Sequence, residues 1–252
     1  MAVQTYRETP LTRLLPLLAF FAVTASPALA ETVNVAVAAN FTAVAEELAA
    51  LFEERSGHEV TLSFGATGQL YAQITQAAPF GVFLSADTAR TEKAIAEGFA
   101  IEGTDFVYAE GQLVLYGPGR DMADGRAVLE GDYQKLAIAD PEAAPYGKAA
   151  LETLTALGLA ARVAPKLVEG ENISQVLQFV ESGNAEVGFV GKSQVIGKAD
   201  QWLVPAKLHA PIAQGAVLLS PGKDNPAALA FLDFLKSEAA VAVIEASGYS
   251  VP

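Results

Sequence analysis

The chain has 252 residues, of which 52% are hydrophobic and 18% are charged, and its 29 acidic residues outnumber its 16 basic ones to give a net charge of −13. This length allows one large domain or two lobes of about 100 residues each. The acidic balance argues against a nucleic-acid-binding protein, which needs basic residues to neutralise phosphates. The chain has no cysteine, which excludes disulfides and thiolate metal sites, and its two histidines, His58 and His209, lie too far apart in sequence to suggest a metal cluster.

Residues 1–30 have the pattern of a secretory signal peptide. Two arginines precede an apolar run over 14–25, and Ala28 and Ala30 form a small-residue cleavage site. The run is shorter than the about 20 residues that a membrane-spanning helix needs, although an N-terminal anchor helix is the alternative. We expect cleavage before Glu31, no lipid anchor because no cysteine follows the run, and a soluble protein of a bacterial periplasm.

Strand and helix patterns alternate along the rest of the chain, because β-branched segments alternate with segments of 3.6-residue periodicity. Gly57 is expected to end the first helix. The predicted strands lie over 32–39, 59–65, 81–86, 106–117, 136–141, 165–170 and 185–190, and near 201–205 and 211–220. The predicted helices begin at 41, 68, 88, 148, 173, 226 and 238.

About ten strands are too many for one compact sheet with this helix content, so the pattern predicts an α/β protein with two lobes. Strand–helix alternation with short connections predicts parallel sheets that are covered on both faces. We expect 31–110 plus 221–252 to form the first lobe and 111–220 the second. Since no linker of Pro or Gly separates them, the chain is expected to cross as extended strands near 108–115 and 215–221, which would form the hinge.

Motifs of common enzyme classes are missing from the sequence. It contains no G-x-S-x-G nucleophile elbow and no G-x-G-x-x-G after a strand, and Gly191-Lys192-Ser193 lacks the first glycine of a P-loop. The sequence does not exclude the paired carboxylates that glycosidases use, because it does not show the distance between two side chains in the folded protein. A periplasmic hydrolase is therefore kept as one alternative to a binding protein.

Four junctions between a strand and the next helix are rich in small and hydroxyl residues. In open α/β sheets, ligands bind at this edge of the sheet. The first N–H groups of a helix have no partner within it and carry partial positive charge, so several such ends can bind an anion. Taken singly, each junction is better explained by helix capping. The junctions are 38–42, 63–69, 140–148 and 169–175.

The centres of these junctions carry neutral residues, with charged residues only at their flanks. Uncharged donors can spread the charge of a dianion over several hydrogen bonds, and a site made only of donors disfavours a ligand that brings its own proton. This favours a fully deprotonated tetrahedral oxyanion over hydrogen phosphate. The arginines lie outside all four junctions, which argues against an organic carboxylate held by an arginine clamp.

The same residues resemble the family of periplasmic molybdate-binding proteins, the receptors of molybdate ABC importers. The resemblance includes the junctions, AAPFGVFLSAD at 77–87, ADPEAAPYG at 139–147 and the terminal GYSVP at 248–252, and it covers essentially all of the chain after residue 30. It implies a type II periplasmic binding protein fold with the ligand clamped in a cleft between two lobes. It also implies no enzymatic activity, no cofactor, a molybdate or tungstate ligand, and an ABC permease of the inner membrane as partner. We expect a monomer and no nucleic-acid partner.

Carried over by position, the resemblance implies a site of neutral hydrogen-bond donors: Asn40 and Ile173 through backbone N–H, Thr67 through hydroxyl and N–H, and Tyr146 through O–H. Molybdenum would be bound as its oxyanion, with no protein atom attached to the metal. Ala39 is a secondary candidate, because some relatives carry a hydroxyl there and one donor would be missing. Gly191 lies where another branch has a tyrosine, and the hypothesis is that Tyr146 substitutes for it from another direction.

A receptor of the same fold for sulfate, phosphate or a carboxylate is the second alternative. Molybdate and tungstate are nearly equal in radius and larger than sulfate, so a rigid cavity is expected to hold the first two and to fit sulfate poorly. Each unmade hydrogen bond to a buried dianion would cost about 1.5–3 kcal/mol. This argument does not separate molybdate from tungstate.

Overall fold

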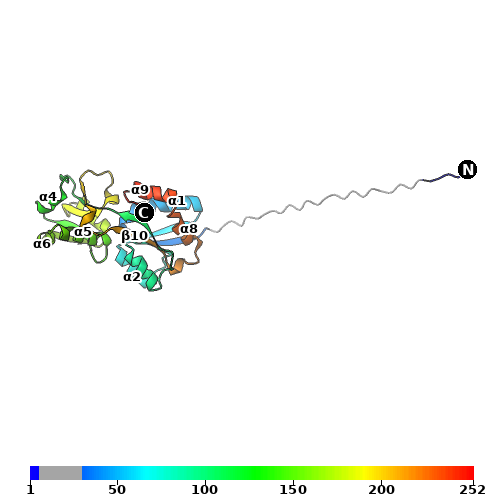
Figure 1. The fold of residues 1–252 in the computed structure, drawn as a ribbon, viewed down its shortest axis with the longest axis horizontal. Coiled ribbons are helices and arrows are strands. Elements are labelled where there is room, and N and C mark those ends of the chain that lie inside the picture. Colours follow the sequence, from blue (N-terminus) through cyan, green and yellow to red (C-terminus); the bar gives the residue numbers. More distant parts are fainter. Residues whose placement is uncertain (6–29) are drawn as a thin grey trace.

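The structure is a computed structural model that describes residues 1–5 and 30–252. The expected signal peptide lies almost wholly outside the described residues. Within them, no helix is long and apolar enough to cross a membrane. From residue 32 onward the chain forms two five-stranded sheets with their helices, at the right and left of the folded part in Figure 1. We call each sheet with its helices a lobe.

The sheet of the first lobe has the strand order β2–β1–β3–β10–β4. Its strands are β1 (Thr32–Ala38), β2 (Glu59–Gly65), β3 (Val82–Leu84), β4 (Phe106–Gly111) and β10 (Ile212–Leu218). β1 pairs in parallel with β2 and β3, whereas β10 runs antiparallel to β3 and β4. Its helices are α1 (Thr42–Ser56), α2 (Thr67–Thr75), α3 (Ala89–Ala96), α8 (Pro226–Phe234) and α9 (Glu238–Ala246).

The sheet of the second lobe has the order β7–β6–β8–β5–β9. Its strands are β5 (Leu113–Tyr116), β6 (Leu136–Ala139), β7 (Leu167–Gly170), β8 (Val187–Gly191) and β9 (Gln201–Leu203). β6 pairs in parallel with β7 and β8, and β5 runs antiparallel to β8 and β9. Its helices are α4 (Gly125–Glu130), α5 (Pro145–Ala156), α6 (Ala160–Val163) and α7 (Ile173–Glu181). Short 3₁₀ turns are η1 (Ala39–Phe41), η2 (Ala164–Lys166), η3 (Lys192–Val195), η4 (Ala206–Leu208) and η5 (Ser220–Gly222).

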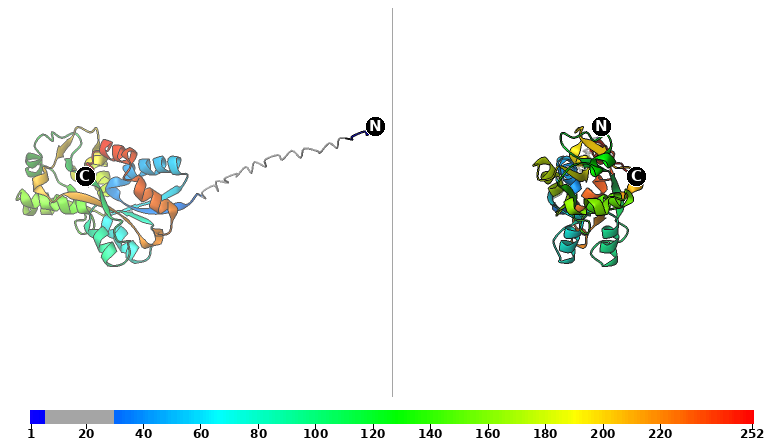
Figure 2. Two further views of the ribbon diagram at one scale, coloured as in Figure 1. Left: turned by 45° about the vertical axis from the view of Figure 1, so that its right-hand side comes forward. Right: turned by 90° about the vertical axis from the view of Figure 1, so that its left-hand side faces the viewer.

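The prediction of parallel sheets is wrong for β5 and β10, the strands next to the points where the chain changes lobe. The predicted extended segment 106–117 is divided at Gln112 into β4 and β5, which belong to different sheets. The sequence analysis also missed α4, whose six residues are too few to show a helical period; its N-cap is Asp124, which accepts from two N–H groups of the first turn. Figure 2 shows the two lobes from two further directions.

The chain passes between the lobes at Gln112 and again over 204–211. The first crossing lies within the predicted segment 108–115. The second, predicted near 215–221, is wrong because β10 is itself a strand of the first sheet. We therefore propose a lobe boundary before β10, at residue 212, rather than after it.

Each lobe has its own hydrophobic core, and the predicted apolar stripe of α1 contributes to the first. Phe52 of this stripe packs edge-on against Phe231 of α8, with ring centroids 5.2 Å apart. Gly57 ends α1 in the left-handed conformation, with a φ of 72°, as predicted. The stripe consists of Phe41, Val44, Ala45, Leu48 and Phe52, all buried.

The first turn of α5 lies directly against the end of β6. A Cβ atom at Gly147 would lie only 2.1 Å from the carbonyl oxygen of Ala139, the last residue of that strand. Glycine is therefore required for this close approach. The approach holds Tyr146, the neighbouring residue, at the carboxyl end of the sheet.

Gly147→Ala is expected to lower the free energy of unfolding by about 1–3 kcal/mol, because the added methyl group overlaps fixed backbone atoms. Urea denaturation followed by circular dichroism would measure this change. Gly191→Ala is the matched control, since its Cβ would have its nearest neighbours at 3.4 Å, an ordinary contact. Equal stability of the two variants would contradict the proposed close approach.

Candidate functional site

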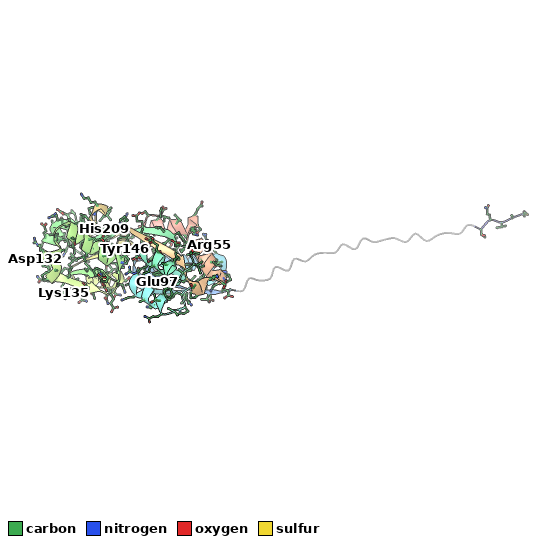
Figure 3. All side chains as sticks on the ribbon, turned by 60° about the horizontal axis from the view of Figure 1, so that its bottom comes forward. Arg55, Glu97, Asp132, Lys135, Tyr146 and His209 are labelled. Carbon is green, nitrogen blue, oxygen red and sulfur yellow. The ribbon has the colours of Figure 1, made fainter. Side chains whose placement is uncertain are left out.

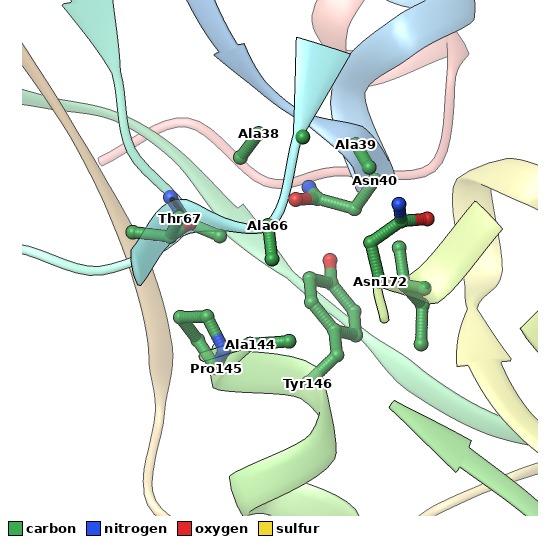
Figure 4. A pocket seen from close by; sticks show the side chains of 12 residues that line it. Ala38, Ala39, Asn40, Ala66, Thr67, Ala144, Pro145, Tyr146 and Asn172 are labelled. Carbon is green, nitrogen blue, oxygen red and sulfur yellow. Dashed lines mark hydrogen bonds between the residues drawn. The ribbon is translucent and has the colours of Figure 1, made fainter. Parts of the chain in front are cut away.

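A small pocket lies between the lobes, where the carboxyl ends of strands from both sheets meet (Figure 4). Its cavity volume is about 10 Å³, whereas pockets for drug-sized molecules have about 300–1,000 Å³. All four predicted junctions contribute to it, so the fold brings them together. The lining residues are Ala38, Ala39, Asn40, Gly65, Ala66, Thr67, Ala86, Ala144, Pro145, Tyr146, Asn172 and Ile173.

All five predicted site residues line this pocket, and none has more than 6% of its surface exposed. Asn40 and Ala39 lie in η1, Thr67 and Ile173 are the first residues of α2 and α7, and Tyr146 is the second residue of α5. Figure 4 shows the Tyr146 side chain reaching from α5 toward the first lobe. The structure thus assembles the predicted residues, and their contact with a ligand stays a prediction.

Backbone and hydroxyl donors face this pocket because of where the helices begin. Asn40, Thr67 and Ile173 lie in first turns, whose N–H groups have no acceptor within the turn or helix itself. Asn172 caps α7 by accepting from the N–H groups of the second and third helical residues. The Thr67 hydroxyl oxygen accepts from the N–H of Ala86 at 3.1 Å, which leaves its own hydrogen free to donate.

None of the described residues that line the pocket is charged. Arginines were expected to lie outside the junctions, and one of them, Arg90, contacts the 140–148 junction. Its guanidinium donates to the carbonyl oxygen of Glu142 at 2.7 Å. Its guanidinium is also paired with Asp87. Arg90 therefore lies beside the 140–148 junction without lining the pocket. In the part of the chain that the structure describes, no group of three or more His, Asp or Glu side chains is arranged to hold a metal ion.

Hydrogen bonds between the lobes close them over the pocket. The N–H of Gly68 donates to the carbonyl oxygen of Ala143 at 2.8 Å. The Ser174 hydroxyl of α7 donates to the carbonyl oxygen of Ala39 at 3.1 Å. The Ser193 hydroxyl of η3 donates to the carbonyl oxygen of Asn40 at 3.2 Å. The structure is therefore a closed form, in which each lobe contributes donors and acceptors to the other.

A group of hydrogen-bonded side chains, which we call the buried polar network, lies behind the pocket. The Asn40 amide nitrogen donates to Gln214 Oε1 at 2.8 Å and to Tyr249 Oη at 3.0 Å. The Tyr108 hydroxyl also donates to Gln214 Oε1, at 3.0 Å, and Gln214 Nε2 donates to Tyr146 Oη at 3.4 Å. The Tyr249 hydroxyl donates to the backbone oxygen of Asn40 at 2.8 Å. The network consists of Asn40, Tyr108, Tyr146, Gln214 and Tyr249.

Burial keeps the three tyrosines of this network protonated. It raises the pKa of the Tyr146 hydroxyl well above its usual range, and the neighbouring Tyr249 and Tyr108 hydroxyls add to the effect. Burial likewise raises the pKa of Tyr108 well above its usual range and raises that of Tyr249. Tyr146, which is labelled in Figure 3, has only 2% of its surface exposed. At neutral pH its hydroxyl is therefore a neutral donor at the pocket.

Comparisons with known proteins agree with this geometry. Residues 33–250 match the family model described as bacterial extracellular solute-binding protein. The chain belongs to the bacterial extracellular solute-binding protein family, in its ModA branch. The molybdate-binding protein ModA of Rhodobacter capsulatus is 53% identical over 228 residues, which cover 89% of this chain and 90% of the relative. ModA of Azotobacter vinelandii is 48% identical over 234 residues, with coverage of 90% and 93%.

The solved periplasmic molybdate-binding protein of Azotobacter vinelandii matches this ModA-family chain with a TM-score of 0.84 and 38% identity. The match covers 87% of this chain and 99% of that structure. The predicted two-lobed α/β fold of periplasmic binding proteins is therefore confirmed.

Sequence reasoning missed most of the buried polar network of this ModA-family chain. Gln214 is a single polar residue inside the otherwise apolar strand β10, and a buried glutamine in such a strand is a signal that could have singled it out. Tyr249 lies in the terminal GYSVP segment, in which no residue was predicted to have a role at the site. Ser193, which adjoins the network through Tyr249, was not predicted to contribute to the site either. No local sequence pattern around Tyr108 indicated that it lies near the pocket.

The buried tyrosines predict a loss of stability at alkaline pH. Their hydroxyls ionise at higher pH in the folded protein than in the unfolded chain, where the pKa is about 10. This stability is complete below about pH 10 and falls above it by about 1.4 kcal/mol per pH unit for each tyrosine that ionises only when unfolded. Urea denaturation between about pH 9 and 11 should show this slope, and Tyr108→Phe should reduce it by one tyrosine's share. Identical slopes would contradict the assignment.

Proposed function

We propose that this ModA-family chain is the substrate-binding component of a molybdate ABC importer, a binding protein of the bacterial periplasm and not an enzyme. The observation that carries the proposal is the small closed pocket formed by several helix N-termini with no charged residue in its lining. Its relatives named molybdate-binding proteins, at 53% and 48% identity over nearly the whole chain, support the same ligand.

The donors would surround a tetrahedral oxyanion from both lobes. In this proposal the N–H groups of Asn40 and Thr67 and the Thr67 hydroxyl come from the first lobe, and the Ile173 N–H and the Tyr146 hydroxyl come from the second. Each helix start adds partial positive charge, which favours an anion without a counter-ion. Molybdenum would stay inside its oxygen shell, so the protein would need no ligand atom on the metal.

The finer parts of the proposal concern ligand range, processing and assembly. We propose that tungstate binds alongside molybdate because the two ions have nearly the same size and charge. We also propose that residues 1–30 are a cleavable signal peptide, that the mature protein has no lipid anchor, and that it works as a monomer. It would deliver its ligand to an inner-membrane permease, which recognises the closed form.

Ala39 of the first lobe and Gly191 of the second bear on which residues supply donors to the site. Ala39 lines the pocket with a methyl group, and its carbonyl oxygen is taken by Ser174, so its side chain would add no donor. A Cβ at Gly191 would lie 3.4 Å from Cε1 of Tyr146. A tyrosine at position 191 would therefore compete for the space of the Tyr146 ring, which supports the hypothesis that one tyrosine replaces the other.

A ligand panel in a thermal-shift assay tests the proposed ligand. Molybdate and tungstate should each raise the melting temperature, because ligand binding stabilises the folded state by about 4 kcal/mol at a thousandfold excess over Kd. Sulfate and phosphate at the same concentration should give much smaller shifts, since the smaller or protonated anion leaves donors unpaired. Equal shifts for sulfate and molybdate would instead indicate a receptor for another anion.

Tyr146→Phe tests the only side-chain donor proposed from the second lobe. Removing one hydrogen bond to a buried anion should weaken molybdate binding by about 10- to 100-fold, from a loss of about 1.5–3 kcal/mol. Isothermal titration calorimetry would measure this. Tyr133→Phe is the matched control, because that buried hydroxyl donates to the carbonyl oxygen of Leu129, outside the pocket. Unchanged affinity in Tyr146→Phe would remove Tyr146 from the site.

A further inference from the structure

Gln214 has no exposed surface and does not line the pocket, yet it contacts two residues that do. It lies in β10, between β3 and β4, in a strand whose other residues are Ile, Ala, Gly, Val and Leu. Burying a primary amide is unfavourable unless its hydrogen-bonding groups find partners. The partners of Gln214 therefore indicate what the residue does.

The two ends of the Gln214 amide face different kinds of partner. Its Oε1 accepts from the Asn40 amide nitrogen at 2.8 Å and from the Tyr108 hydroxyl at 3.0 Å, which uses both of its lone pairs. Its Nε2 therefore points the other way, to Tyr146 Oη at 3.4 Å. Gly111 leaves room for this contact, since a Cβ there would lie 2.1 Å from Tyr146 Oη and 2.9 Å from Gln214 Nε2.

This contact limits the directions that the Tyr146 hydroxyl hydrogen can take. Because Nε2 carries hydrogens, the Tyr146 oxygen accepts on that side and its own hydrogen must point elsewhere. The nearby Tyr249 oxygen already accepts from the Asn40 amide at 3.0 Å and lies 2.9 Å from the Ser193 hydroxyl. On the side away from Gln214, the Tyr146 hydrogen has two acceptors within reach: the Tyr249 oxygen, with which the Tyr146 hydroxyl forms a hydrogen bond, and a ligand oxygen in the pocket.

We propose that Gln214 is a positioning residue, which orients the Tyr146 hydroxyl so that it donates its hydrogen to the bound oxyanion. The inference rests on the proposed function, because it assigns a role within that binding site. Gln214 itself would not touch the ligand. Its contribution is to keep the Tyr146 hydrogen on the side that faces Tyr249 and the pocket, where a bound oxyanion can accept it in place of Tyr249.

The groups around Gln214 allow this role over a wide pH range. The titratable groups that face it are Tyr108 from β4, Tyr146 from α5 and Tyr249 after α9, and all three stay protonated. Two carboxylates lie near the strands that flank β10. Asp87 forms an ion pair with Arg90, and Glu110 on β4 is exposed to solvent. Binding by the unaltered protein should therefore vary little between about pH 6 and 8.5.

A double-mutant cycle tests the inference with molybdate as the probe. Gln214→Met removes the amide and keeps a similar volume, and it should weaken binding about tenfold, as expected for a lost hydrogen bond to an anion. In the Tyr146→Phe background the same change should alter affinity by less than about twofold, because there is no hydroxyl left to orient. Isothermal titration calorimetry of the four proteins measures the coupling, and circular dichroism checks that each one folds.

The outcomes separate the inference from the proposed function. If the unaltered protein does not bind molybdate, both are overturned. If it binds and Gln214→Met costs the same in both backgrounds, Gln214 acts only by supporting Asn40 and the inference alone is overturned. If Gln214→Met fails to fold, the pH profile of Gln214→Glu, which keeps the shape of the side chain, tests the inference without the cycle.

Gln214→Glu also supplies a readout that a purely structural role would not change. When protonated, its carboxyl group can still accept from Asn40 and Tyr108 and donate to Tyr146. When ionised it has only acceptors, so it would take the Tyr146 hydrogen and repel a dianion. Burial without a cation would raise the pKa of this carboxyl group above its usual value of about 4.3, so affinity should fall at least tenfold between about pH 6 and 8.5. A pH profile as flat as that of the unaltered protein would overturn the inference.

Discussion

The structure depends on the meeting of several helix N-termini at one uncharged pocket between two lobes. Each N-terminus has N–H groups that its helix cannot use, and burying them without an acceptor is unfavourable. A tetrahedral oxyanion supplies acceptors in several directions at once, so one small ligand can satisfy groups from both lobes. In the proposed function, binding and lobe closure would therefore be parts of the same equilibrium, because the donor set would be complete only in the closed form.

The neutrality of the pocket explains why its geometry matters so much. A buried arginine would attract any anion of suitable charge, whereas N–H and O–H donors stabilise an ion only when each one reaches an oxygen atom at hydrogen-bond distance. Close contacts such as that of Gly147 with Ala139 hold the helix start at a defined distance from the sheet. In the proposed function, selection by size would follow from rigid placement, since an ion that is too small would leave donors unpaired at about 1.5–3 kcal/mol each.

The sequence alone predicts those features of the fold that depend on a local pattern of residues. The α1 stripe, the Gly57 cap and the four junctions follow from periodicity and from the rule that parallel strands present their carboxyl ends at one edge. Strand direction at β5 and β10 was not predictable in this way, because it depends on which sheet the chain enters after each crossing. The buried polar network was out of reach for a similar reason: 106 positions separate Tyr108 from Gln214 and 209 separate Asn40 from Tyr249.

The buried polar network also joins the two lobes. Tyr108 and Gln214 are on β4 and β10, the strands of the first sheet that adjoin the two crossings, whereas Tyr146 and Ser193 belong to the second lobe. Opening the lobes would separate Gln214 from Tyr146 and Ser193 from Asn40, while the bonds among Asn40, Tyr108 and Gln214 stay within the first lobe. The Tyr146 hydroxyl would then be free to turn in the open form and would be oriented only on closure. Closure would thus bring the last donor to the pocket and set its direction in the same step.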